Sequence, residues 1–210
     1  MVQPLEWLQD VYGTAWQSLA DAMRRGLPVP AAFVVFRSTP EAEVRAAYEK
    51  LKVQEHTHFV AVRGPTHPVL NVVGPDQLVH TLRRLWTGSP DSPLLVQRMV
   101  HAMWCGRTQS DEEKLRITAN EGMLLLDPDS YIVNKAAGEC IERVLEPKQR
   151  KMIRHVDGTP KVVAREGERT PMPAKLLAGI ASLAARTDSD IRWAIDDRDV
   201  IWLLAAVKRS

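Results

Sequence analysis

The chain contains few cysteines, neither of them with a second cysteine or a paired histidine at zinc-ligand spacing, and no long apolar run. Cys105 and Cys140 are its only two cysteines, and they lie far apart in the sequence. This spacing argues against both a zinc cluster and a disulfide scaffold. No apolar run approaches the ~18 residues that a membrane span needs, and residues 1–7 lack the basic start and apolar centre of a signal peptide. We therefore expect a soluble, cytoplasmic protein with no membrane partner.

A marked excess of charge of one sign is also missing. The chain carries 28 Lys and Arg residues against 26 Asp and Glu residues, which gives a net charge of +2. This near balance gives no electrostatic preference for a polyanion, so nucleic acid is a disfavoured partner, although the isoelectric point of about 8.6 does not forbid it. Hydrophobic residues make up 45% of the chain and charged residues 26%, as in ordinary globular proteins. The 210 residues are enough to form a hydrophobic core that needs no disulfide or metal to stabilise it.

The common catalytic motifs are absent as well. The sequence has no Walker loop, dinucleotide fingerprint, nucleophile elbow or metalloprotease helix. His56 and His58 share one face of an expected strand, but no third metal ligand is implied, so we interpret them as surface histidines. Arg63 ends an apolar strand just before Gly64 and Pro65, where its guanidinium could bind a phosphate or could simply be solvated.

The hydrophobic pattern predicts an α+β fold. Four segments have helical spacing and the remaining apolar segments are short and typical of strands. The helices are expected at 14–25, 40–52, 76–86 and 173–186, and the strands at 31–36, 58–63, 69–73, 94–100, 114–119, 122–126, 130–135, 140–146, 151–156, 161–165, 191–196 and 200–205. Residues 87–93 include Gly, Ser and two Pro, which favours a boundary between lobes at 1–92 and 93–210.

Several short strings, taken in order, resemble the ATP-binding domain of phosphoenolpyruvate synthase and pyruvate phosphate dikinase. Each string alone is weak, but their common order along nearly the whole chain makes coincidence improbable. The matching segments are 13–20, 25–35, 60–63, 69–72, 95–100, 128–135 and 190–196.

This resemblance implies an ATP-grasp-like fold over residues 1–210, with two α+β lobes and a nucleotide in the cleft between them. The hinge strand at Gln97, Met99 and Val100 would hold the base of ATP or of another nucleotide. Arg63 would face the phosphates, Thr14 would lie at the phosphate loop, and Asp190 would be a weak candidate metal ligand.

The departures from the family pattern predict impaired catalysis. Thr14 stands where the family has its phosphate-binding lysine, Arg192 replaces the metal-binding glutamate, and residues 205–208 lack the family's glutamine and arginine. At ~4 Å and an effective dielectric near 20 one unit charge contributes about 4 kcal/mol, so this reversal at Arg192 disfavours Mg²⁺ there. Arg192 could instead neutralise phosphate directly, together with Arg63.

Three functional hypotheses follow. The first is a divergent nucleotide-binding or regulatory module that has lost phosphotransfer, a pseudoenzyme with a nucleotide and a protein as expected partners. The second is an active stand-alone ATP-dependent phosphotransferase, or kinase, in which Glu121 has become a metal ligand. The third is a scaffold that binds nucleic acid or protein through basic segments such as 148–151 and 208–209, which are also typical of a solvated turn and tail. We favour the first hypothesis because the three losses are coordinated.

Overall fold

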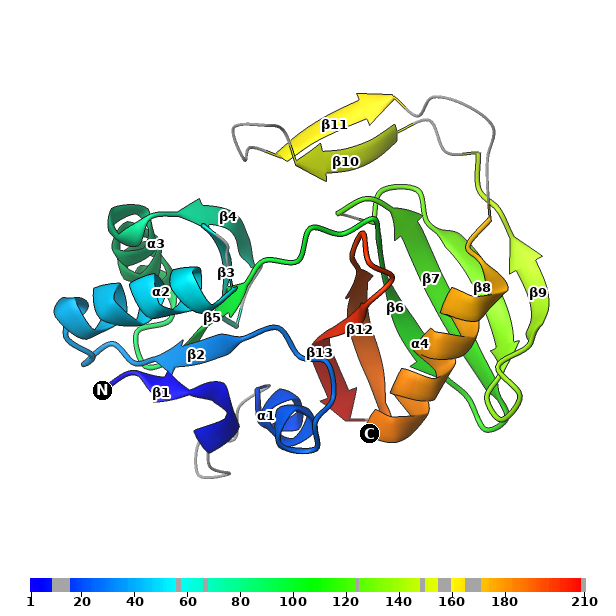
Figure 1. Cartoon of the computed structure of the whole chain (residues 1–210), viewed down its shortest axis with the longest axis horizontal. Helices are drawn as coiled ribbons and strands as arrows, with labels where there is room; N and C mark the ends of the chain where they lie inside the picture. The colour runs from blue at the N-terminus through cyan, green and yellow to red at the C-terminus, as the bar shows by residue number, and fades with distance from the viewer. Residues whose placement is uncertain are drawn as a thin grey trace. The chain divides into compact units, whose positions relative to one another are not determined.

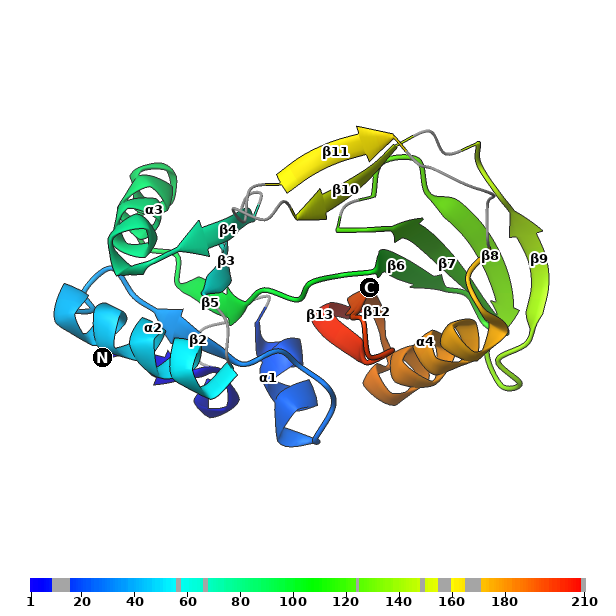
Figure 2. The ribbon, with the colours of Figure 1, turned by 45° about the horizontal axis from the view of Figure 1, so that its top comes forward.

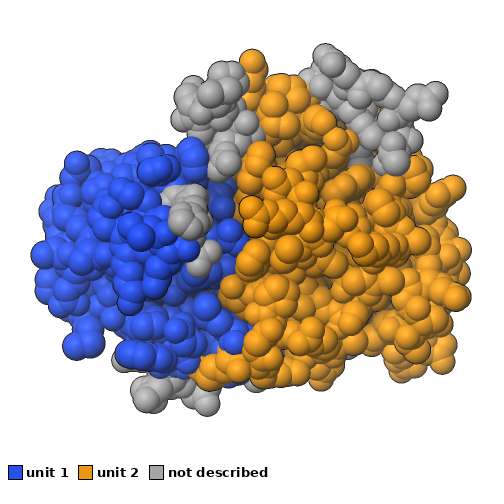
Figure 3. Space-filling model, viewed as in Figure 1, with its two compact units in different colours: residues 1–23, 30–99 blue, residues 24–29, 100–210 orange. Residues whose placement is uncertain are grey.

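The structure is a computed structural model that describes residues 1–8, 16–55, 58–65, 68–123, 125–147, 150–154, 160–164 and 171–208. The chain divides into two compact units (Figures 1 and 3). Unit 1 comprises residues 1–23 and 30–99, and unit 2 comprises residues 24–29 and 100–210. Each unit has its own antiparallel sheet, so the prediction of an α+β fold is confirmed.

Unit 1 is built on a five-stranded sheet in the order β1-β2-β5-β3-β4, with every recorded pairing antiparallel. Two long helices pack on one face, where buried aliphatic side chains of strands and helices form one core cluster. The strands are β1 (Gln3–Pro4), β2 (Ala32–Val35), β3 (Phe59–Arg63), β4 (Val69–Val73) and β5 (Leu94–Arg98), and the helices are α2 (Glu41–Glu55) and α3 (Pro75–Gly88). The 3₁₀ helix η1 (Leu5–Trp7) and helix α1 (Gln17–Arg24) complete its first part.

The helix boundaries of unit 1 follow from local signals. Glu41 and Glu43 lie in the first turn of α2, where negative charge complements the helix dipole. Pro75 opens α3 directly after Gly74, whose φ of 80° suits a residue without a Cβ. The sequence predicted α2 from Pro40 and the two glutamates and α3 from the spacing of its apolar residues, and both predictions are confirmed.

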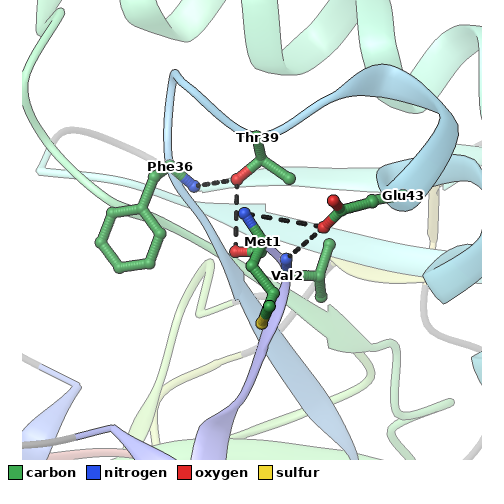
Figure 4. A network of polar contacts seen from close by, with 5 residues as sticks. All are labelled: Met1, Val2, Phe36, Thr39 and Glu43. Carbon is green, nitrogen blue, oxygen red and sulfur yellow. Dashed lines mark hydrogen bonds and ion pairs between the residues drawn. The ribbon is translucent and has the colours of Figure 1, made fainter.

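Polar contacts attach Met1 and Val2, just before β1, to the first turn of α2 and to the loop that precedes it (Figure 4). Glu43 Oε2 accepts a hydrogen bond of 3.0 Å from the Val2 amide and lies 3.6 Å from the Met1 amine. Thr39 Oγ1 accepts a 3.2 Å bond from the Phe36 amide and donates a 3.5 Å bond to the Met1 carbonyl. These contacts fix the edge strand that extends the sheet.

Unit 2 contains a six-stranded antiparallel sheet in the order β13-β12-β6-β7-β8-β9 and one helix (Figure 2). Helix α4 (Ala174–Thr187) buries Leu176, Leu177 and Ile180 and contacts β8, β12 and β13. The strands are β6 (Trp104–Ser110), β7 (Lys114–Glu121), β8 (Asp129–Asn134), β9 (Cys140–Val144), β12 (Ser189–Ile195) and β13 (Ile201–Lys208). A separate hairpin pairs β10 (Arg150–Arg154) with β11 (Pro160–Ala164).

The structure differs from the predicted strands in several places. Strand β6 was not predicted, because it alternates small, polar and charged residues and buries only part of its length. No strand forms at 122–126 within the described residues, since Gly122 turns away with φ 90° after β7 ends. Unit 1 includes β5 and ends at Met99, because β5 pairs with both β2 and β3.

Candidate functional site

The middle of the unit 1 sheet contains a buried polar side chain with no partner. Gln97 is 1% exposed and lies in β5, opposite Ala32 on β2 and Ala61 on β3. Neither its Nε2 nor its Oε1 forms a hydrogen bond with any described residue. Buried amides are normally hydrogen-bonded, and leaving one unsatisfied costs about 1–3 kcal/mol. This glutamine therefore has unused capacity for one acceptor and one donor contact.

A second amide with unused hydrogen-bonding groups lies beside the end of β5. Asn71 on β4 has a φ of 55°, and its side-chain Nδ2 and Oδ1 are buried without hydrogen bonds among the described residues. Its backbone amide lies 3.4 Å from the Met99 Sδ atom, and the Met99 amide donates a 3.0 Å bond to the Phe59 carbonyl. The strand pairing thus brings Asn71 and Met99 together, two residues after Gln97.

Arg63 shares the sheet face of Gln97. It lies opposite Leu95, while Ala61, two residues earlier, lies opposite Gln97. Side chains alternate along a strand, so this face is opposite the one on which Val60 and Val62 pack in the helix-covered core. Arg63 is half-buried at the end of β3. The predicted base-binding glutamine and phosphate-binding arginine therefore lie on one face of one sheet.

The remaining predicted site residues are found elsewhere. Val100 is 8% exposed and follows Met99 directly in the chain. Asp190 and Arg192 lie on β12 in unit 2, where the Asp190 carboxylate accepts a 2.8 Å bond from the Ser110 amide. Thr14 lies outside the described residues.

Arg192 is exposed and lies directly opposite Arg107 of β6. Among the described residues no group of three or more His, Cys, Asp or Glu side chains is arranged to hold a metal ion. Glu121, the alternative metal ligand, pairs at 2.6 Å with Lys151. The register partner of Arg192 is therefore a second cation, and both carboxylates that the sequence suggested for a metal are engaged by hydrogen-bond donors.

Sequence reasoning missed Asn71 and Arg107. An asparagine inside a valine-rich strand is a usable signal, because Asn tolerates the left-handed backbone that Val and Leu avoid. Arg107 carried no comparable signal, since its role depends on pairing with Arg192, 85 positions later in the chain, and β6 was itself not expected.

The side-chain amides of Gln97 and Asn71 carry hydrogen-bonding groups of the kind that recognises a nucleotide base. A carboxamide offers a donor N–H and an acceptor oxygen side by side. Its oxygen can accept a hydrogen bond from the exocyclic amine of adenine while its N–H donates to a ring nitrogen. The thioether of Met99 supplies an adaptable apolar surface at the same place. The residues present therefore suit a planar ligand with both hydrogen-bonding and apolar parts.

Comparison with known proteins gives a fold and no family. No protein-family model matches the chain, and no curated protein matches it by sequence. Solved structures do match: the D-alanine–D-alanine ligase from Bacillus anthracis complexed with ATP has 9% identity and a TM-score of 0.51, covering 90% of this chain and 53% of that one. D-alanyl-alanine synthetase A from Vibrio cholerae has 13% identity and a TM-score of 0.50, covering 95% and 55%.

A third match is the N5-carboxyaminoimidazole synthase from Aspergillus clavatus in complex with ADP and an aminoimidazole ribonucleotide, with 11% identity and a TM-score of 0.52, covering 92% of this chain and 43% of that one. The chain thus spans about half the length of the solved structures it matches. None of its described helices is both long and apolar enough to span a membrane. At these identities the likeness establishes the fold alone: an α+β fold of the ATP-grasp type.

Proposed function

We propose that this chain is a nucleotide-binding module of the ATP-grasp type that reads the base of an adenine nucleotide with Gln97 and Asn71. The observation that carries the proposal is the fully buried Gln97 carboxamide, which has no hydrogen-bond partner among the described residues. A base that supplies one donor and one acceptor would satisfy it. Two of the matching structures are complexes with ATP and with ADP, which gives further support through the shared fold.

The same proposal includes loss of magnesium-assisted phosphotransfer, as expected for a divergent relative of the phosphoenolpyruvate synthase and pyruvate phosphate dikinase domains. Arg192 and Arg107 are both cations, and a divalent ion prefers anionic or carbonyl oxygens. Asp190 and Glu121 are already held by the Ser110 amide and by Lys151. The chain then acts by binding a nucleotide, and a protein that reads this binding is its proposed partner.

Titration of adenosine into the purified protein tests base recognition without any phosphate contribution. We expect saturable binding of one adenosine per chain, which Gln97→Leu weakens about fivefold or more, because a bidentate amide-to-adenine contact contributes about 1–3 kcal/mol. Gln54→Leu is the matched control, since Gln54 is an exposed glutamine on α2 of the same unit. Equal affinity of both variants for adenosine, or no binding at all, would refute the proposed base site.

A further inference from the structure

Two arginines face each other across neighbouring strands in unit 2. Arg192 of β12 and Arg107 of β6 are register partners, and both side chains are exposed. Directly opposed residues in an antiparallel pair have their Cβ atoms about 4.5–5.5 Å apart, and like charges at that distance repel. The sheet thus maintains a local concentration of positive charge that opposes its own stability.

A third arginine extends this pair along the sheet. Arg107 lies opposite Thr118 on β7, and Arg116 is two residues from Thr118, so the two arginines are diagonal neighbours on one face. A hydrogen bond of 3.4 Å to the Ser130 Oγ atom orients the Arg116 guanidinium. We call Arg107, Arg116 and Arg192 the arginine row.

The arginine row lies on the face of the sheet opposite the core. On each of its three strands the neighbouring positions are buried: Thr108 at 2% exposure, Ile117 at 0% and Ile191 at 1%. Thr108 Oγ1 also accepts a 2.9 Å bond from the Ile191 amide, which ties β6 to β12 beneath the row. Because strands present alternate residues to opposite faces, the three guanidinium groups project from a rigid, packed support.

Carboxylates do not neutralise the row within the described part of the chain. In unit 1, by contrast, Arg45 pairs with Asp76 at 2.7 Å and Arg83 pairs with Glu41. Asp190 is two residues from Arg192 on β12, and its Oδ1 accepts the Ser110 amide. Glu142, opposite Ile132, lies on the exposed edge strand β9. No ion pair to any member of the row is formed among the described residues.

The row favours phosphate over nucleic-acid bases. Binding of single-stranded nucleic acid relies on aromatic side chains on which bases stack. On this sheet Tyr131 and Trp193 are 1% and 0% exposed on its core side. Trp104 and Trp202 are half-buried, and the Trp202 indole N–H is held by a 2.8 Å bond to Asp196 Oδ2. What the open face offers is a line of planar guanidinium forks, which match phosphate oxygens bidentately.

We propose that the arginine row Arg107, Arg116 and Arg192 binds a chain of phosphate groups directly, without a bridging divalent cation. If the bound phosphates are those of the nucleotide, this assignment rests on the proposed function. If they belong to a free polyphosphate, the assignment is independent of it. Spacing of the positive charges along a sheet face suits several linked phosphates better than one. Mg²⁺ weakens this binding, because it coordinates the same oxygens and removes the negative charge that the arginines recognise.

The test is a calorimetric titration of inorganic tripolyphosphate in EDTA at low ionic strength. We expect one site per chain, with affinity reduced about tenfold or more in each of Arg107→Gln, Arg116→Gln and Arg192→Gln, because each substitution removes a charge-assisted contact. Arg143→Gln is the matched control: Arg143 is exposed on the same sheet, but its register partner Tyr131 lies on the core face. The control variant should bind as the original chain does.

Several outcomes would overturn the proposal: no binding of tripolyphosphate, equal losses in the Arg143 variant and the row variants, or tighter binding when excess Mg²⁺ replaces EDTA. Affinity that rises with the length of a single-stranded oligonucleotide would replace the proposal with a polynucleotide surface. Adenosine titration separates this result from the base site. Tripolyphosphate binding without adenosine binding refutes the proposed function and leaves the row intact, and the reverse result refutes only the row.

Discussion

The sheets of the two units differ in where, among the described residues, they place unpaired polar side chains. In unit 1, the neutral amides of Gln97 and Asn71 are buried with unused hydrogen-bonding capacity. In unit 2, the charged Arg107 and Arg192 are exposed next to each other. A buried neutral amide discriminates by hydrogen-bond pattern, whereas exposed cations discriminate by charge and are screened by salt. The comparison indicates that unit 1 is suited to an uncharged hydrogen-bonding group and unit 2 to an anionic group.

The largest change in stability is expected from a substitution at Gly106, in the packed side of the sheet beneath the arginine row. A Cβ at Gly106 would lie 2.3 Å from both the Thr118 carbonyl oxygen and a ring atom of Trp193. Gly106→Ala should therefore destabilise unit 2 by about 3 kcal/mol or more, because neither the backbone nor a fully buried indole can yield cheaply.

Thermal unfolding followed by tryptophan fluorescence measures this loss. Gly88→Ala is the control, since a Cβ there meets nothing within 4 Å at the end of α3. If the two alanine variants melt together, the close packing beneath the arginine row is not a constraint on its sheet.

The next largest change in stability is expected in unit 1, at the buried amide of Gln97. Gln97→Leu removes two unsatisfied buried polar atoms while keeping much of the side-chain volume, so it should stabilise the unliganded chain by about 1–2 kcal/mol. The same variant should lose adenosine binding. Urea unfolding gives the free energy, and a destabilised Gln97→Leu variant would show that the carboxamide has a structural role.

Salt distinguishes the two recognition modes directly. Raising ionic strength from 50 to 200 mM should weaken tripolyphosphate binding severalfold, since the row is exposed and the Debye length falls below about 10 Å above 0.1 M salt. Adenosine binding should change little over the same range. Calorimetry of both probes in one buffer series checks this, and parallel salt slopes would contradict the division of roles.

The smallest effect concerns the repulsion between the paired arginines. Arg192→Glu converts a like-charge cross-strand pair into an opposite-charge pair, which should stabilise the chain by about 0.2–1 kcal/mol at low salt while abolishing tripolyphosphate binding. The gain in the unfolding free energy should shrink as salt is added. A loss of stability at low salt would show that Arg192 contributes favourably to the folded chain.

Local signals made most elements predictable. The start of α2 follows from Pro40 and two glutamates, and the strand at Phe59–Arg63 follows from an apolar run of the right length. Strand β6 escaped prediction because its burial depends on partners β7 and β12 that come later in the chain. The placement of β5 in the first unit likewise depends on pairing with β2 and β3, which no local pattern encodes.

The candidate site was predictable in part. Residue type and strand position suggested Gln97 and Arg63, but only the register reveals that they share a sheet face. Asn71 and Arg107 became candidates only through contacts between segments distant in the sequence. Asn71 lies beside Met99, and Arg107 lies opposite Arg192 because β6 pairs with β12. Sequence strings identified an ATP-grasp resemblance, and the α+β fold of solved ligases supports that fold while leaving the specific dikinase relationship a prediction.

Calorimetric titration of ATP, with Mg²⁺ and with EDTA, into the original chain and into Gln97→Leu, Arg63→Ala and Arg192→Gln tests whether the chain binds a nucleotide without a metal ion. The account predicts that ATP binds in EDTA at least as tightly as with Mg²⁺, and that each of the three variants weakens the binding. Binding that requires Mg²⁺, accompanied by ATP hydrolysis, would contradict the account and identify a working phosphotransferase. Absence of ATP binding under both conditions would contradict it as well.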